Sequence, residues 1–305
     1  MGRRRDPDVS GVLVVDKPAG MTSHDVVARA RRALGIRRVG HTGTLDPAAT
    51  GVLVCAVGRA TRLVQFMQSG PKTYAATMVL GRETDSQDAD GEVVAEADAS
   101  HLTEEDVCAV LKTFVGTIEQ VPPMVSAVKV GGERLHAKAR RGEVVEREPR
   151  TVTVHDLVLD EFVPGERAQL SFLVTCSGGT YVRTIAHDVG RELGVGGSLT
   201  ALQRLSTGGF GLEDALALDD VDALGEDRTL RERLVPVADA LRLLPAVEVD
   251  DEVRDDLVHG RPMSAHGHDG PYAVHDRAGR LVGVYADHDD RARPEVVMLR
   301  PDDLA

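Results

Sequence analysis

The segment GHTGTLDPAATG, residues 40–51, places one carboxylate in a loop rich in glycine and threonine. Asp46 stands directly before Pro47, and the loop runs into the apolar segment VLVCAVG at 52–58. An Asp-Pro pair is a common turn former, so a structural turn accounts for the pair by itself. The alternative is a carboxylate that acts on a bound molecule, because glycines let the backbone approach a ligand closely. The loop alone leaves both interpretations open.

A second candidate group lies in GGTYVRT, residues 178–184, which contains Tyr181 and Arg183. An arginine can pair with a carboxylate and hold it ionised and oriented. A tyrosine can offer a flat apolar face to a base. The simpler alternative is a core tyrosine beside a surface arginine.

Tyr74 is a third candidate, since the chain has only four tyrosines and no tryptophan. It lies near the start of the apolar segment TYAATMVLG, residues 73–81, just after the basic residue Lys72. A tyrosine near basic residues suits stacking on an unstacked nucleobase. An ordinary half-buried strand tyrosine is the simpler alternative.

Other residue types argue against a metal or a cofactor. His266 and His268 lack partner ligands at the spacing of a known metal site. Cys55, Cys108 and Cys176 lie in separate apolar segments, and their odd number argues against disulfides and zinc. We expect them to be small core residues in a reducing cytoplasm. The chain has no P-loop, dinucleotide-binding glycine motif or nucleophile elbow, so no cofactor and no metal are expected.

The formal net charge of −13 at pH 7 hides an uneven distribution of charge. Residues 1–72 carry 12 Lys and Arg against 5 Asp and Glu, and residues 129–150 carry 7 against 4. Residues 206–305, in contrast, carry 11 against 23. Two basic segments in an acidic chain predict a local track for phosphate groups, while the acidic remainder provides solubility. Chance clustering on a solvated surface explains the charges equally well.

Strands and loops are expected to position these residues. Buried strands are predicted at residues 11–18, 73–81 and 168–179. The segment 52–58 is either a buried strand or the start of a helix. Residues 121–150 are rich in Pro, Gly and positive charge, and we expect them to form a long exposed loop.

Helices are expected where capping residues precede apolar periodicity. Thr22 or Ser23 can cap a helix that stops at Gly35. Thr103 can cap a second helix with acidic residues in its first turn. Residues 180–193 are expected to form a third helix.

Length and composition predict two domains, residues 1–235 and 236–305. The second contains PYAVHDRAGRLVGVYA, two alternating runs around a turn that predict a hairpin, and we expect it to be small and β-rich. No apolar run is long enough to span a membrane. The N-terminus lacks the apolar segment of a secretory signal.

Taken in order, these segments resemble the bacterial tRNA pseudouridine-55 synthases, the TruB family. The resemblance rests on GVLVVDKPAGMTSHDVV, GHTGTLDPAATGVL, KTYAATMVLG, TDSQDADGE, PPMVSAVKVGGERLHAKARRGE, CSGGTYVRTIAHDVG and LTALQRL. It covers roughly residues 10–210, and the GHTGTLDP block is highly specific to this family.

The resemblance implies the pseudouridine synthase α/β fold, a mixed and mainly antiparallel sheet flanked by helices. The small β-rich C-terminal domain is then either PUA-like or specific to a lineage. The implied enzyme is an isomerase that converts uridine 55 in the TΨC loop of tRNA to pseudouridine, without cofactor or metal. The base must leave its stack, so we expect a base flipper. A cytoplasmic monomer without membrane association is also implied.

Residue roles carried over by position follow from the same resemblance. Asp46 is implied to be the nucleophile, which attacks either C6 of the uracil or C1′ of the ribose. Tyr74 is implied to stack on the flipped base and is a candidate for helping to remove the C5 proton. Arg183 is implied to pair with the catalytic carboxylate.

Further positions match family residues near the substrate. Tyr181 and Leu202 match residues that pack around the base, and His41 matches a histidine that contacts the RNA loop. Lys17 matches a lysine whose role is mainly structural. The loop at 121–150 resembles the family's thumb, which closes on the RNA.

Two alternatives stand beside catalysis by a stand-alone enzyme. A tRNA-binding folding chaperone would not need Asp46. A guide-dependent synthase would need partner proteins, which the thumb loop makes a weaker hypothesis.

Overall fold

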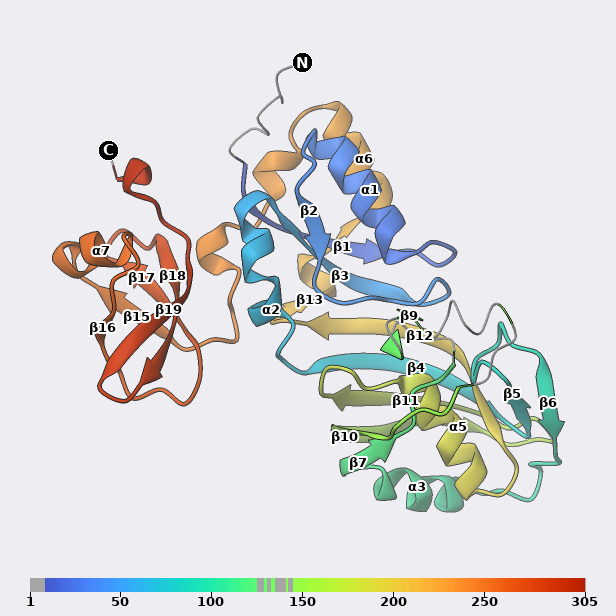
Figure 1. Ribbon diagram of the computed structural model, residues 1–305. Helices are drawn as coiled ribbons and strands as arrows, with labels where there is room; N and C mark the ends of the chain where they lie inside the picture. Colours follow the sequence, from blue (N-terminus) through green and yellow to red (C-terminus); the bar gives the residue numbers. More distant parts are fainter. Residues whose placement is uncertain (1–8, 125–128, 131–132, 135–140, 142–144, 305) are drawn as a thin grey trace. The chain divides into compact units, whose positions relative to one another are not determined.

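The computed structural model shows a mixed α/β chain (Figure 1). The residues that it describes are 9–124, 129–130, 133–134, 141 and 145–304. The chain divides into two compact units: unit 1 contains residues 1–70 and 206–305, and unit 2 contains residues 71–205. Unit 2 is therefore inserted into unit 1 along the sequence. No helix within the described residues combines the length and the apolar composition needed to cross a membrane.

Unit 1 is built on the antiparallel pair β1 (Gly11–Lys17) and β3 (Thr50–Val57), which pair along the whole of β1. β1 also pairs in parallel with β14 (Leu216–Ala217), and β3 pairs with β2 (Val39–His41). The segment at residues 52–58, for which both a strand and the start of a helix were expected, therefore forms part of strand β3.

Alternation along β1 sends its side chains into two different cores. Leu13 and Val15 pack against α1 (Ser23–Leu34). Val12 and Val14 pack on the opposite side, with Leu63, Met67, Phe210, Ala273 and Val284. Because both faces of the strand are buried, its sequence is a continuous apolar run and does not alternate with polar residues.

The helix α1 begins and ends where the sequence predicts. Thr22 is the N-cap: its hydroxyl accepts the backbone N–H of Asp25, and the Asp25 carboxylate accepts the N–H of Thr22. Gly35 follows the last turn with a φ of 67°, a left-handed conformation that favours glycine. In Figure 1, α1 lies beside α6 (Leu218–Glu226).

The C-terminal part of unit 1 is small and β-rich, as predicted. The predicted turn joins β17 (Tyr272–Asp276) to β18 (Leu281–His288) in an antiparallel hairpin. Buried Asp276 closes this turn by accepting the backbone N–H groups of Ala278 and Arg280. The sheet has the order β15-β17-β18-β19-β16. Its other elements are β15 (Ala246–Val249), α7 (Asp251–Leu257), β16 (Met263–Ser264) and β19 (Arg291–Val297). The domain boundary at residue 235 stays a prediction.

Unit 2 contains strands in the order β12-β4-β11-β10-β7. β4 and β11 confirm the strands predicted at 73–81 and 168–179, and they pair antiparallel. The bounds are β4 (Lys72–Leu80), β7 (Gly116–Gln120), β10 (Arg150–Val163), β11 (Gln169–Cys176) and β12 (Gly197–Thr207). A separate ladder joins β5 (Arg82–Thr84) to β6 (Val93–Glu96).

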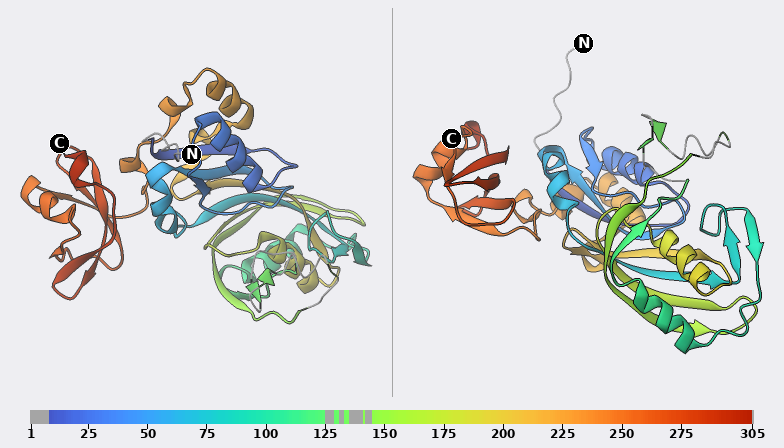
Figure 2. Two further views of the ribbon diagram at one scale, coloured as in Figure 1. Left: turned by 45° about the horizontal axis from the view of Figure 1, so that its top comes forward. Right: turned by 60° about the horizontal axis from the view of Figure 1, so that its bottom comes forward.

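Two helices cover this sheet. α3 (Glu104–Thr113) packs against β10, and α5 (Val182–Glu192) packs against β4. They lie beside one another in both views of Figure 2. Thr103 caps α3 as predicted, with its hydroxyl accepting the N–H of Asp106. α5 confirms the helix predicted at 180–193.

Gly190 in α5 lies against the chain that enters β12. A Cβ added there would overlap the backbone nitrogen of Gly197. We expect Gly190→Ala to lower the free energy of unfolding by about 1–3 kcal/mol, because backbone atoms cannot move aside without disturbing the strand. Urea unfolding followed by circular dichroism measures this change.

Glu192→Ala is the matched control, since Glu192 is exposed on the same helix. We expect it to change stability by less than about 0.5 kcal/mol. Equal stability of the two variants would contradict the close approach of α5 to β12.

Candidate active site

Asp46 is half-buried in the loop between β2 and β3. The backbone N–H and the carbonyl of the residue before it, Leu45, are both hydrogen-bonded to one side chain. The backbone N–H of Leu45 donates to Ser23 Oγ at 2.9 Å, and Ser23 Oγ donates to the carbonyl of Leu45 at 3.2 Å. Leu45 and Ser23 are both buried. The carboxylate of Asp46 therefore extends from backbone that α1 holds in place.

Lys17 binds the residue on the other side of Asp46. Its ammonium group is fully buried and donates to the carbonyl of Pro47 at 3.1 Å and to that of Pro18 at 2.8 Å. The N–H of Gly20 also donates to the Pro47 carbonyl, at 2.9 Å. A buried ammonium needs such partners, because its removal from water is costly. These contacts fit the structural role expected of Lys17, which stays a prediction.

His41 lies at the end of β2, where the Asp46 loop begins. Its half-buried ring packs edge-to-face against the exposed His24 of α1, with 5.3 Å between the ring centroids and 84° between the ring planes. The contact with RNA implied for His41 stays a prediction.

Arg183 lies in the first turn of α5 and is 5% exposed. Its Nη1 lies 3.1 Å from Oδ2 of Asp88, a residue that the sequence analysis did not single out. The next residue, Thr184, donates its hydroxyl to Gln87 Oε1 at 2.8 Å. The acidic loop between β5 and β6 is thus bound to the start of α5. Several acidic residues in this loop were equal candidates for an arginine partner, so the sequence could not select Asp88.

Gln120 holds the backbone of Tyr181. The N–H of Tyr181 donates to Gln120 Oε1 at 3.0 Å, and Gln120 Nε2 donates to the Tyr181 carbonyl at 3.2 Å. Gln120 is buried at the end of β7, and Tyr181 is the N-cap of α5. This double contact sets where α5 starts, and with it the position of Arg183.

Tyr74 lies on β4 opposite Val174 and is 8% exposed. Leu202 is half-buried on β12, the neighbouring strand. Burial lowers the pKa of the Lys72 ammonium, at the start of β4, and the positive charge of Arg204 lowers that pKa further. Arg204 is fully buried as well. Lys72 and Arg204 therefore lie close enough in this part of unit 2 for their like charges to interact.

The predicted site residues fall into two groups. Unit 1 carries Lys17, His41 and Asp46, and unit 2 carries Tyr74, Tyr181, Arg183 and Leu202. Within unit 1, Lys17 binds the loop of Asp46, and within unit 2, α5 carries Arg183 directly after Tyr181. The pairing of Asp46 with Arg183 stays a prediction.

Part of the basic segment 1–72 is neutralised inside unit 1. Arg29 of α1 forms ion pairs with Asp219 and Asp222 of α6. Arg59 forms an ion pair of 2.7 Å with Asp303 near the C-terminus. The positive charge that remains to attract phosphate groups is therefore smaller than the count of basic residues indicates.

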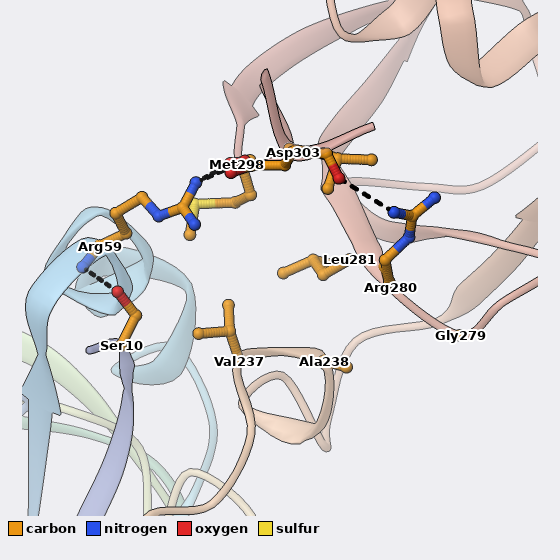
Figure 3. Close-up of a pocket in the computed structure, with 10 residues that line it drawn as sticks. Ser10, Arg59, Val237, Ala238, Gly279, Arg280, Leu281, Met298 and Asp303 are labelled. Carbon is orange, nitrogen blue, oxygen red and sulfur yellow. Dashed lines mark hydrogen bonds and ion pairs between the residues drawn. The ribbon is translucent and has the colours of Figure 1, made fainter. Parts of the chain in front are cut away.

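A pocket of about 340 Å³ lies elsewhere in unit 1 (Figure 3). Its lining includes Ser10, Arg59, Arg280 and Met298, and none of the predicted site residues. Arg59 Nη1 donates to the carboxylate of Asp303 at 2.7 Å, and Arg280 Nη1 donates to the Asp303 carbonyl at 3.2 Å. The polar groups of this pocket thus bind one another and hold the C-terminal sheet to the rest of unit 1.

Removal of the Asp88 carboxylate is expected to take one charged partner from the buried Arg183 guanidinium. We expect Asp88→Ala to lower the free energy of unfolding by about 1–3 kcal/mol. A double-mutant cycle with Arg183→Ala, measured by urea unfolding, isolates the coupling between the two side chains. Asp90→Ala is the control, since Asp90 is exposed in the same loop. A coupling energy of zero would contradict the importance of the pair.

Models of one protein family match consecutive segments of the chain. The TruB family pseudouridylate synthase (N terminal domain) matches residues 31–182. The tRNA pseudouridylate synthase B C-terminal domain matches residues 183–242, and tRNA pseudouridine synthase II, C terminal, matches residues 244–299.

Known proteins agree with these family models. A tRNA pseudouridine synthase B of Symbiobacterium thermophilum is 54% identical over 253 residues, which are 83% of each chain. A tRNA pseudouridine synthase B of Thermobifida fusca is 45% identical over 94% of this chain and 98% of its own. A solved H/ACA RNP bound to a substrate RNA containing 2′-deoxyuridine gives a TM-score of 0.73 at 25% identity, covering 99% of this chain and 93% of that chain. The chain belongs to the TruB family of pseudouridylate synthases.

Proposed function

We propose that this pseudouridine synthase modifies uridine 55 in the TΨC loop of tRNA, with Asp46 as its nucleophile. The observation that carries the proposal is the Asp46 loop, in which a half-buried carboxylate stands between Leu45 and Pro47, both bound through their backbone. Curated relatives named tRNA pseudouridine synthase B support a tRNA substrate. The choice of uridine 55 rests on the resemblance of the GHTGTLDP block.

The proposed reaction is an isomerisation that neither adds nor removes atoms. The C1′–N1 bond breaks, the freed uracil turns within the site, and a C1′–C5 bond forms. The proton on C5 is lost, and N1 gains one. Asp46 attacks either C6 of the base or C1′ of the ribose, and both routes need its ionised carboxylate. Arg183 is proposed to favour that ionised form by pairing with it.

The target base has to leave its stack before Asp46 can reach it. Tyr74 is proposed to stack on the flipped base and to help remove the C5 proton. Tyr181 and Leu202 are proposed to pack around the base, and His41 to contact the RNA loop. The half-buried positions of Tyr181 and Leu202 support this assignment, because each leaves part of its side chain accessible.

The grip on the RNA is proposed to come from basic residues and from the thumb at 121–150. Much of the thumb lies outside the described residues; within it, β8 (Lys129–Val130) pairs antiparallel with β9 (Glu133–Arg134). Binding to phosphate groups releases the cations condensed on the RNA, and this release is less favourable at higher salt concentration. The affinity for tRNA should therefore fall with rising ionic strength.

The substrate is tested by incubating the full chain with an unmodified TΨC stem-loop and mapping pseudouridine in the product. We expect conversion at position 55, and no product from a stem-loop with cytidine at that position. Product at a different uridine would overturn the substrate assignment. Tight binding without any product would favour the folding chaperone instead.

The nucleophile is tested by Asp46→Asn, which removes the charge and keeps the size of the side chain. We expect the rate of product formation to fall by more than about a thousandfold, with the Kd for tRNA within a few-fold of the parent value. Asp220→Asn is the control, because Asp220 is an exposed carboxylate on α6 of the same unit. Product formation by Asp46→Asn at the parent rate would show that Asp46 is not the nucleophile.

A further inference from the structure

One hydroxyl group satisfies both backbone groups of the residue before Asp46. Ser23 Oγ accepts the Leu45 N–H at 2.9 Å and donates to the Leu45 carbonyl at 3.2 Å. A hydroxyl can do both, since it has one proton to donate and two lone pairs that accept. Ser23 is 1% exposed and Leu45 is 3% exposed, so neither contact is shared with bulk water.

Ser23 is itself held by a well-defined helix start. It is the first residue of α1 and follows the N-cap Thr22, whose side chain and backbone both bind Asp25. The hydrogen bonds of this cap also lower the pKa of the Asp25 carboxyl group, chiefly through the Thr22 hydroxyl. Through Ser23, the start of α1 therefore holds Leu45 in place. The apolar face of α1 packs in turn into the core around Leu13.

Two further backbone contacts lie within the loop. The N–H of Thr42 donates to the Val54 carbonyl at 3.0 Å, and the N–H of Ala49 donates to the Asp46 carbonyl at 3.1 Å. The first holds the start of the loop against β3. The second closes a turn within the loop and does not attach it to another element. Ser23 supplies the attachment on the N-terminal side of Asp46, as Lys17 and Gly20 supply the one on its C-terminal side.

We propose that Ser23 is a positioning residue for the nucleophile and acts through the backbone of Leu45. This inference rests on the proposed role of Asp46. A nucleophile must be held close to its attack geometry, and a displacement of about 1 Å can cost about 100-fold in rate. Without the hydroxyl, the loop can shift while the helix and the rest of unit 1 stay folded. Substrate binding, which uses other residues, is then retained.

The test compares three substitutions at Ser23 in the full chain, with the stem-loop as substrate. Ser23→Ala and Ser23→Cys keep or nearly keep the volume of the side chain but remove its strong hydrogen bonds. We expect both to lower the single-turnover rate by about 10- to 100-fold, with the Kd for the stem-loop within about threefold. Ser23→Thr keeps the hydroxyl, and we expect it to restore most of the rate.

Ser10→Ala is the matched control. Ser10 Oγ accepts the backbone N–H of Arg59 at 2.9 Å, at the opposite end of the β1–β3 ladder from the Asp46 loop. We expect this variant to keep the parent rate. A loss as large as that of Ser23→Ala would overturn the proposal, because any lost hydroxyl contact in unit 1 would then have the same effect.

Amide hydrogen exchange gives a readout that a general loss of stability would not produce. We expect Ser23→Ala to speed exchange at Leu45 and Asp46 while amides in the β1–β3 ladder stay protected. If both Ser23→Ala and Ser23→Cys fold and react at the parent rate, Ser23 has no positioning role. That result leaves the proposed function intact, whereas activity in Asp46→Asn would overturn the proposed function itself.

Discussion

The backbone around Asp46 is bound by a hydroxyl on one side and by a buried ammonium on the other. Both groups come from one short stretch of chain: Lys17 ends β1, and Ser23 begins α1. The turn between them brings both groups to the Asp46 loop, so the position of the loop depends on how β1 and α1 pack. Apolar side chains on one face of β1 fix that packing. The proposed nucleophile thus takes its position from an ordinary strand–helix core.

Unit 2 uses the same kind of contact for Arg183. Gln120 binds the backbone at the start of α5, Asp88 binds the guanidinium, and Gln87 accepts the neighbouring Thr184 hydroxyl. Each of these partners comes from a part of the chain distant in sequence. Side chains whose own partners are fixed lose little entropy when they meet a substrate, which is how an enzyme holds reacting groups ready. The buried charged side chains of this unit also need partners, because burial removes them from water.

Local sequence was enough to predict the elements that carry their own signals. The capped helix after Thr22, the hairpin at residues 277–280 and the strands around Tyr74 follow from capping residues, turn residues and apolar runs. The family resemblance, confirmed by the comparisons, placed the candidate residues. The contacts of Ser23 with Leu45, 22 residues along the chain, have no local signal, because many serines lie near helix starts. The long strand β10 was also missed, since polar residues and bulges interrupt its alternation.

The insertion of unit 2 into unit 1 has a consequence for the order of events during synthesis. A chain leaves the ribosome N-terminus first, and compact parts tend to fold as they are completed. Unit 2 is continuous, so all of it has emerged while β1 still lacks β14 and the two backbone hydrogen bonds with Val235. The loop of Asp46 precedes unit 2 along the chain, yet it belongs to the unit that is completed after unit 2. Unit 2, which carries Arg183, is therefore complete in the emerging chain before unit 1, which carries Asp46.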